Sequence, residues 1–245
     1  MPCLLPPLAA TETPLTRGWD PGMIDFAAAR RMMVDGQVRT GGVTDLRIIG
    51  AMLELPRERF VGEANADLAY LDFDIEVARN GAGARPRRLL KPMVLARMLQ
   101  AAPVRAEDRV LDVGCATGYS SALLARLARR VVALEEDPAL AARARANLAG
   151  IAENVTVVIG PLPQGAAADA PYDVIFLDGA SEVEPRSLFG QLDPDGGRLV
   201  AVVGGAPIGR AMVYRAGAGK VSGWPVFDAA AGLLPGFAAP AEFVF

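Results

Sequence analysis

Residues 109–119 read Arg-Val-Leu-Asp-Val-Gly-Cys-Ala-Thr-Gly-Tyr, and this stretch decides the fold. It opens with the short apolar run of a buried parallel strand, which Gly114 and Gly118 follow. Because glycine lets the backbone bend sharply and approach a ligand closely, the stretch predicts a strand, a nucleotide-binding turn and a helix in succession. A plain turn whose glycines serve only packing is the alternative.

The spacing of the glycines argues against a dinucleotide. A turn that holds a pyrophosphate carries glycine at its first, third and sixth positions. In this chain those positions are Gly114, Ala116 and Tyr119. A pyrophosphate ligand is therefore not favoured.

A second apolar run, residues 131–134, ends in Glu135 and Glu136. Nucleotide-binding folds place a carboxylate about 20 residues after the glycine turn, where it bonds the sugar hydroxyls. A solvated charge at a strand end is the alternative interpretation. Asp137 and Pro138 then suit the N-cap and the first residue of a helix, so strands and helices continue to alternate.

The composition is that of one α/β domain with no bulk attraction for nucleic acid. The 245 residues are 52% hydrophobic, the net charge is −3 and the pI is about 5.2. Because the net charge is negative, a nucleic-acid partner is not expected. No apolar stretch is long enough to span a bilayer, so a membrane partner is not expected either. The chain is expected to be a monomer. Of 25 basic residues only Lys91 and Lys220 are lysines, a usage typical of a GC-rich bacterial source.

Cysteine and histidine usage narrows the chemistry. The two cysteines, Cys3 and Cys115, lie far apart in the chain, so a disulfide framework is not expected and a reducing cytoplasm is the default location. Histidine is absent from the sequence, which excludes Ser-His and Cys-His nucleophiles and most zinc sites. No metal site is expected.

Periodicity and turn residues divide the chain into three parts: a disordered leader at 1–22, an N-terminal helical cap with a substrate-side segment at 23–103, and a core at 104–245. Helices are predicted at 25–39, 45–54 and 92–102, an extended segment at 69–77 and a Gly/Arg-rich loop at 79–88. Core strands are predicted at 109–113, 131–135, 155–159, 173–178 and 197–203, and a hairpin-like region at 243–245.

With these elements placed, the chain from about Arg31 onward resembles the protein-L-isoaspartate O-methyltransferase family. The pattern Asp-x-Gly-x-x-x-Gly at 112–118 is similar to the first motif of S-adenosylmethionine-dependent methyltransferases. Further motifs that carry the resemblance are Arg31-Met32-Met33-Val34, Gln37-Val38-Arg39, Leu55-Pro56-Arg57-Glu58-Arg59-Phe60-Val61, Leu68-Ala69-Tyr70-x-Asp72, Pro92-Met93-Val94-Leu95-Ala96-Arg97-Met98, Tyr172-Asp173-Val174-Ile175 and Gly196-Gly197-Arg198-Leu199-Val200.

The resemblance implies a doubly wound, Rossmann-like, seven-stranded methyltransferase sheet with an N-terminal helical cap. It also implies S-adenosylmethionine as the cofactor and methyl transfer to a carboxylate of L-isoaspartyl residues in damaged proteins. Such an acceptor is ionised at neutral pH and needs no general base. The residues expected at the cofactor by motif position are Asp112, Gly114, Cys115, Gly118, Glu135 and Gly160. Tyr119 and Glu136 are expected as neighbours, and packing of the helix start is the alternative role of Tyr119. Asp112 is expected at the methionine ammonium and Glu135 at the ribose, and Glu135→Ala is expected to weaken cofactor binding while barely affecting folding.

The chain departs from the family pattern on the acceptor side. Leu90 and Lys91 stand where the family has a serine before its Gln-Pro or Ala-Pro, Pro161 replaces the acid of a Gly-Asp-Gly, and Asp178 replaces the threonine of a Thr-Ala-Ala. Asp178 and Lys91 are therefore the candidate catalytic residues. Each residue has two alternative roles. Asp178 either positions an acceptor or caps a turn. Lys91 either attracts an anionic acceptor or belongs to a solvated surface. Two alternative functions stay open: a methyltransferase with a different acidic or small acceptor, and a cofactor-binding but catalytically idle binding module.

Overall fold

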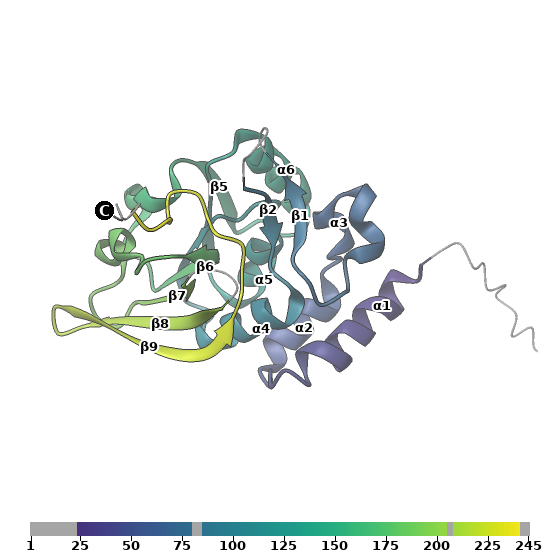
Figure 1. The fold of residues 1–245 in the computed structure, drawn as a ribbon, viewed down its shortest axis with the longest axis horizontal. Helices are drawn as coiled ribbons and strands as arrows, with labels where there is room; N and C mark the ends of the chain where they lie inside the picture. Colours follow the sequence, from purple (N-terminus) through teal and green to yellow (C-terminus); the bar gives the residue numbers. More distant parts are fainter. Residues whose placement is uncertain (1–23, 80–84, 205–207, 241–245) are drawn as a thin grey trace, which may run out of the picture.

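The computed structural model describes residues 24–79, 85–204 and 208–240 (Figure 1). The predicted leader at 1–22 and the predicted hairpin at 243–245 lie outside these residues. In Figure 1 the N-terminal helices, drawn in purple and blue, lie on the right, and a long hairpin in yellow-green projects on the left.

A seven-stranded sheet in the order β5-β4-β3-β6-β7-β8-β9 forms the centre of the molecule. The five strands from β5 to β7 are parallel, and β8 and β9 each run antiparallel to the preceding strand. This confirms the predicted fold class and the five predicted core strands. The bounds are β3 Arg109–Val113, β4 Arg130–Glu135, β5 Val155–Ile159, β6 Val174–Ser181, β7 Arg198–Val203, β8 Gly209–Gly217 and β9 Lys220–Ala229.

The order of the strands creates a crevice between β3 and β6. From β3 the chain proceeds through β4 to β5 on one side, while β6 and β7 lie on the other. Open α/β sheets bind ligands outside the carboxyl ends of the strands at such a switch point. The turn after β3 and the end of β6 therefore face the expected ligand position.

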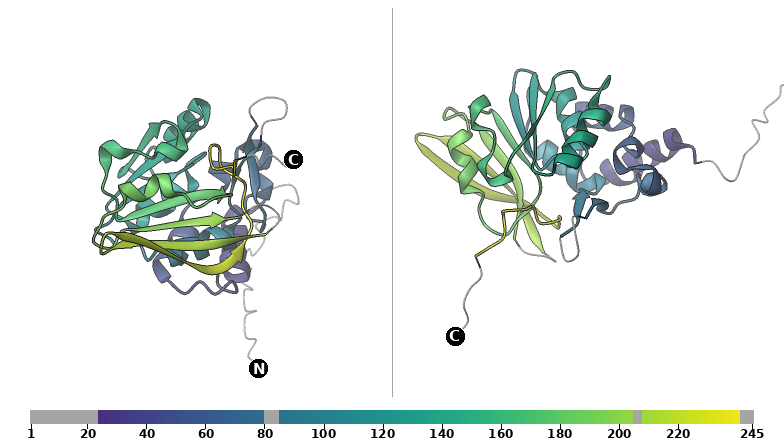
Figure 2. Two further views of the ribbon diagram at one scale, coloured as in Figure 1. Left: turned by 60° about the vertical axis from the view of Figure 1, so that its left-hand side comes forward. Right: turned by 90° about the horizontal axis from the view of Figure 1, so that it is seen from above.

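Alternate residues of the central strands point to opposite faces of the sheet. On one face Val110 and Phe176 pack in a core cluster with α4 (Pro92–Ala101), α5 (Tyr119–Leu127) and the N-terminal cap. On the other face Leu111 and Leu177 pack against the short 3-10 helices Leu162–Gln164 and Arg186–Gln191 and the C-terminal residues Leu234 and Phe237. Figure 2 shows these two layers on either side of the sheet.

The cap consists of short helices, of which the first two α-helices begin at aspartate caps. Helix α1 (Phe26–Met33) begins after Asp25, and the π-helical turn Val34–Val38 continues it. Helix α2 (Leu46–Glu54) begins after Asp45, whose side chain accepts from a backbone N–H. Helix α3 (Glu58–Val61) and the 3-10 helix Glu63–Leu68 follow in the cap. The core also contains α6 (Pro138–Leu148) and the 3-10 helix Ala167–Asp169.

The segment between the cap and α4 differs from the prediction. Only Ile75–Ala78 of the predicted extended segment forms a strand, β1, and it pairs with β2 (Arg87–Leu89). The predicted loop at 79–88 therefore overlaps a strand at Arg87. A buried arginine at an inward strand position gives no apolar alternation from which the strand could be predicted.

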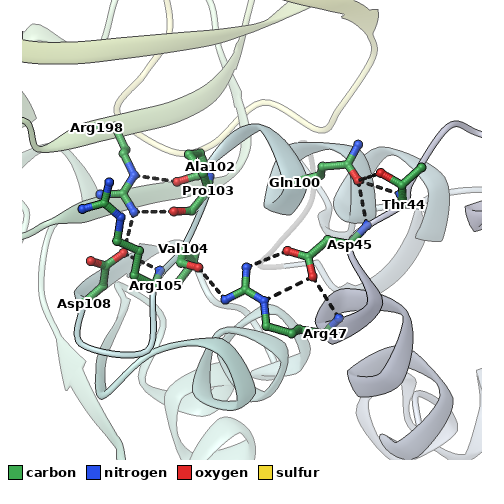
Figure 3. Close-up of polar contacts among 10 residues, drawn as sticks. All are labelled: Thr44, Asp45, Arg47, Gln100, Ala102, Pro103, Val104, Arg105, Asp108 and Arg198. Atoms are coloured by element: carbon green, nitrogen blue, oxygen red, sulfur yellow. Dashed lines mark hydrogen bonds and ion pairs between the residues drawn. The ribbon is translucent and has the colours of Figure 1, made fainter.

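The linker between α4 and β3 is held by polar contacts from both sides (Figure 3). From β7, Arg198 donates to the carbonyls of Ala102 and Pro103 and pairs with the buried Asp108. From the cap, Arg47 donates to the carbonyl of Val104 at 3.0 Å. These contacts fix the position of β3 relative to the cap, and so the position of the turn that follows it.

Candidate functional site

The glycine turn has the left-handed backbone that its sequence predicts. Gly114 has φ +80° and Gly118 φ +94°, and Ala116 between them has φ +49°, which a residue with a side chain seldom adopts. A Cβ on Gly118 would lie 3.1 Å from Leu148 of α6, so this glycine allows close helix packing. Close packing against α6 is therefore enough to explain why residue 118 is a glycine, without a ligand.

Asp112 on β3 is a fully buried carboxylate beneath the turn. Its Oδ2 accepts hydrogen bonds from the hydroxyls of Ser120 at 2.7 Å and Ser121 at 2.6 Å, and its Oδ1 has no partner among the described residues. Burial raises the pKa of Asp112 to about 6, against the lowering effect of the two hydroxyls. An unpartnered buried carboxylate oxygen is ready for a cationic ligand group.

Glu135 at the end of β4 is fully buried, and both of its oxygens are already occupied. Arg87 of β2 donates to Oε1 at 3.1 Å and to Oε2 at 2.9 Å, and the backbone N–H groups of Ala116, Glu136 and Asp137 also donate to the carboxylate. The expectation that Glu135→Ala barely affects folding is therefore corrected. The substitution would leave Arg87 buried without its partner, which is strongly destabilising.

Asp178 of β6 is 3% exposed, and its Oδ1 has no partner among the described residues. Burial, followed by repulsion from Asp112, raises the pKa of Asp178 well above its usual range. Asp178 lies within β6, three residues before its last residue Ser181, on one of the two strands that flank the switch point, and its orientation toward the cleft stays a prediction. Its alternative role as a turn cap does not apply, because β6 continues to Ser181.

A buried aromatic and cationic group lies on the same face as the acids. The Tyr119 ring packs against Phe60 with a centroid distance of 5.4 Å, and its hydroxyl has no partner among the described residues. The Arg57 guanidinium lies 4.8 Å from the Tyr119 centroid and donates to the carbonyls of Ala69 and Leu90. Sequence reasoning missed Arg57, because an arginine in a run of charged residues looks exposed.

Cys115 is fully buried in the turn, and burial raises the pKa of its thiol well above the usual range. The thiol is therefore protonated and unreactive at neutral pH. Gly160 lies at the end of β5 and donates its N–H to the carbonyl of Glu135 at 3.1 Å. It thus fixes the end of β4 from the next strand.

A cavity of about 330 Å³ opens beside the end of β4. Its walls come from Glu136 and Asp137, from Arg85 and Arg87, and from the C-terminal residues 233–236 and 238. Glu136 thus lies at an open volume, and its role at a cofactor stays a prediction. Arg87 and Leu234, which line this cavity, also contact Gly114 of the glycine turn.

The C-terminal segment after β9 closes the crevice in a way that the sequence did not reveal. It runs beside β6, with Ala180 donating to the carbonyl of Gly232 at 2.8 Å and Leu234 donating to the carbonyl of Ala180 at 2.9 Å (yellow in Figure 1). A Cβ on Gly114 would lie 2.8 Å from Leu234, and one on Gly179 would lie 2.7 Å from it. Leu234 therefore packs directly on two glycines that flank the switch point.

The basic cluster at 85–91 separates in the structure. Arg87 is buried, whereas Arg85 and Arg88 are exposed and lie 3.8 Å from Glu182 and Glu76. Lys91 is half-buried at the start of α4, and its backbone N–H donates to Asp74 at 2.9 Å. The cluster thus contributes Arg87 to the buried site and Arg85 to the wall of the cavity beside it, while Arg88 lines a separate hollow with Glu76.

Within 24–79, 85–204 and 208–240, no three or more His, Cys, Asp or Glu side chains are arranged to hold a metal ion. No helix in the same ranges combines the length and apolar character needed to cross a membrane.

Comparison with known proteins places this arrangement among methyltransferases. Residues 28–223 match the family described as Protein-L-isoaspartate(D-aspartate) O-methyltransferase. A relative with the name Protein-L-isoaspartate O-methyltransferase from Koribacter versatilis is 37% identical over 202 residues, which cover 82% of this chain and 88% of that protein. One with the same name from Methanoregula boonei is 41% identical over 177 residues, which cover 72% of this chain and 78% of that protein.

Among solved structures, too, the chain is similar to proteins of this name. A protein-L-isoaspartate O-methyltransferase superposes with a TM-score of 0.72 at 25% identity, and the match covers 84% of this chain and 66% of that chain, just under two thirds of its length. A putative protein-L-isoaspartate O-methyltransferase from Plasmodium falciparum, in complex with S-adenosyl-L-homocysteine, superposes with a TM-score of 0.68 at 15% identity, which supports the fold alone.

Proposed function

Because the chain belongs to the protein-L-isoaspartate(D-aspartate) O-methyltransferase family, whose methyl donor is S-adenosylmethionine, we propose that it methylates the carboxylate of L-isoaspartyl residues in proteins. The observation that carries the proposal is the glycine turn at the switch point, between buried Asp112 and buried Glu135. This is the arrangement of acids that a nucleoside with a cationic tail requires.

The residues of the site fit the donor, provided that the ribose replaces Arg87 as a partner of Glu135. Asp112 offers an unpartnered oxygen to the ammonium end, and the cavity beside Glu136 offers volume to the nucleoside. At Glu135, ribose hydroxyls would replace the two N–H groups of Arg87, while three backbone N–H groups keep the carboxylate in place. The site thus contains the polar groups that the donor needs.

Methyl transfer to a carboxylate requires little acid or base catalysis from the protein. When bound, the donor supplies a methyl group on a positively charged sulfur. The acceptor carboxylate is already ionised at neutral pH, so the absence of histidine is no obstacle. The task of the chain is to orient the two reactants and to exclude water, and the buried face around Asp112, Tyr119 and Arg57 provides a dry wall.

The finer assignments belong to the same proposal. Lys91 stays a candidate at the acceptor entrance, because it begins α4 on the rim near Asp74 and adds positive charge there. We expect the protein to act as a monomer in the cytoplasm, on protein or peptide carboxylates rather than on nucleic acid. Net charge −3 supports the last point.

One observation favours a second candidate, a fold that binds partners without turnover. Arg87 and Leu234 lie over Gly114, at the place where a nucleoside would approach the turn. A chain in which these contacts are permanent would not bind the donor at all. The decisive experiment must therefore separate binding from transfer.

We propose radiolabelled methyl transfer to an isoaspartyl peptide, with the matched aspartyl peptide as control, alongside calorimetry with S-adenosylhomocysteine. Label on the isoaspartyl peptide alone is the expected result. Binding of S-adenosylhomocysteine without label on either peptide would favour another acceptor or an idle module. Absence of both binding and label would reject the enzyme.

A further inference from the structure

Asp112 and Asp178 lie on the two strands that flank the crevice, β3 and β6. Asp112 pairs in register with Phe176, and Asp178 follows Phe176 by two residues. Asp112 and Phe176 therefore share one face of the sheet, and Asp178 lies in a stretch of β6, between Phe176 and Ala180, where the pairing with β7 is irregular. The charge of Asp112 acts on Asp178, which indicates that the two carboxylates are close. Phe176 and Ala180 both pack in the core cluster on the side of the cap. Resemblance to the family assigns a role to Asp112 only, since Asp178 stands where the family has threonine.

Each of the two acids has one oxygen without a partner among the described residues, although each is at least nine-tenths buried. Ser120 lies close to both, because its hydroxyl donates to Asp112 at 2.7 Å and also lowers the pKa of Asp178 against the effect of burial. Buried carboxylates normally carry paired charges or hydrogen bonds on both oxygens. Two adjacent acids with unpartnered oxygens therefore point to a missing cationic ligand.

The charges around the pair do not balance. Three acids beside the crevice are buried: Asp112, Glu135 and Asp178. Arg87 pairs with Glu135, while Arg57 donates to two carbonyls and forms no ion pair within 4 Å in the described residues. Facing groups from neighbouring elements are Ser120 and Ser121 of α5 and the thiol of Cys115. The charges of Arg87 and Arg57 also act on Asp178, although neither forms an ion pair with it in the described residues. The pair thus lacks a cation of its own.

We infer that Asp178 joins Asp112 in a two-carboxylate subsite that reads the positive charge of the methyl donor. The inference rests on the proposed function and deepens it. The donor carries a sulfonium in addition to its ammonium, and its product has lost the sulfonium charge. A second acid therefore raises the affinity for the donor above that for the product, which favours donor binding before transfer and product release after it.

The pair also makes donor binding depend on pH. Burial raises the pKa of both acids, and repulsion from Asp112 adds to the rise at Asp178, so the free protein keeps a proton on the pair to a higher pH than an exposed carboxylate would. A cationic ligand favours the doubly ionised pair and displaces that proton. Affinity for the donor then increases as pH rises toward the pKa of the free pair, and proton release on binding is the direct signature.

The test compares three probes by calorimetry: S-adenosylmethionine, sinefungin, which carries an amine in place of the sulfonium methyl, and S-adenosylhomocysteine, whose sulfur is neutral. The variants are Asp178→Asn and Asp178→Thr, with Asp195→Asn as the control because it removes the same charge from an exposed site. Thermal unfolding verifies that each variant is folded.

We expect both Asp178 variants to weaken the two cationic probes at least tenfold more than S-adenosylhomocysteine. Titrations in two buffers of different ionisation enthalpy should show fewer protons released by the variants. Equal weakening of all three probes, or unchanged affinities, would overturn the subsite. An effect confined to the KM of the peptide acceptor would overturn it too, and would place Asp178 at the acceptor. Because the binding arms contain no acceptor, a failure of isoaspartyl methylation alone leaves their result intact.

Discussion

Replacing Arg87 by glutamine should destabilise the free protein and yet tighten donor binding. Arg87 makes two hydrogen bonds to Glu135 and one to the carbonyl of Gly114 at 3.1 Å, and its side chain is 7% exposed. Breaking a buried ion pair costs about 3–5 kcal/mol. We expect the lower end of that range, because Glu135 keeps three backbone N–H donors.

The effect on binding has the opposite sign. In the proposed complex, ribose hydroxyls must displace the Arg87 N–H groups from Glu135, and a net hydrogen bond to a charged group contributes about 1.5–3 kcal/mol. Removing this competitor should lower the Kd of S-adenosylhomocysteine at least tenfold, which corresponds to about 1.4 kcal/mol. Denaturant unfolding measures the first effect, and calorimetry on the folded variant measures the second.

Arg88→Gln is the matched control, because Arg88 is the adjacent residue of β2 and is exposed, 3.8 Å from Glu76. It should change neither quantity. Weaker binding by a folded Arg87→Gln protein would refute the reasoning, since it would mean that Arg87 holds the donor rather than competing with it. Unchanged binding would show that Glu135 does not receive the ribose.

Three further outcomes follow from the structure. Arg198→Ala should lower the free energy of unfolding by about 3–5 kcal/mol, since it leaves buried Asp108 unpaired, and an unfolding midpoint equal to that of the unaltered protein would contradict this. Gly118→Ala should destabilise by roughly 1–3 kcal/mol, because it combines a positive φ with a Cβ only 3.1 Å from Leu148, whereas Gly190→Ala, with open space at the Cβ, serves as its control. Asp112→Asn should change the pH dependence of stability. The pKa of Asp112 is raised to about 6 in the folded protein, so the stability that its protonated form contributes is present at low pH and is lost as the pH rises through about 6. In parallel denaturant titrations between pH 4 and 7, the asparagine variant should therefore lose less stability than the unaltered protein.

Local patterns in the sequence determined the parallel strands, the helix starts and the glycine turn. The apolar run at 109–113 could only be a buried strand, and Asp137 with Pro138 starts α6 as expected, its carboxylate accepting from Ala139 and Leu140. Such features depend on residues within one or two turns of each other, and short-range periodicity and capping record them directly. The hairpin β8–β9 was not located, because its long outer strand is mostly exposed and carries little apolar alternation.

Only the tertiary structure decided which polar groups meet. Arg87 lies 48 positions from Glu135 in the chain, and nothing near either residue shows that they pair. Leu234 reaches Gly114 and Gly179 only because the C-terminal segment runs beside β6, and Arg57 is buried only because the cap packs its guanidinium over Tyr119. The sequence by itself determined the glycine turn and the two acids beside it, Asp112 and Glu135. The fold decided that one of these acids already has a partner and that Asp178 lies beside the other, because burial and charge pairing are set by contacts between distant segments of the chain.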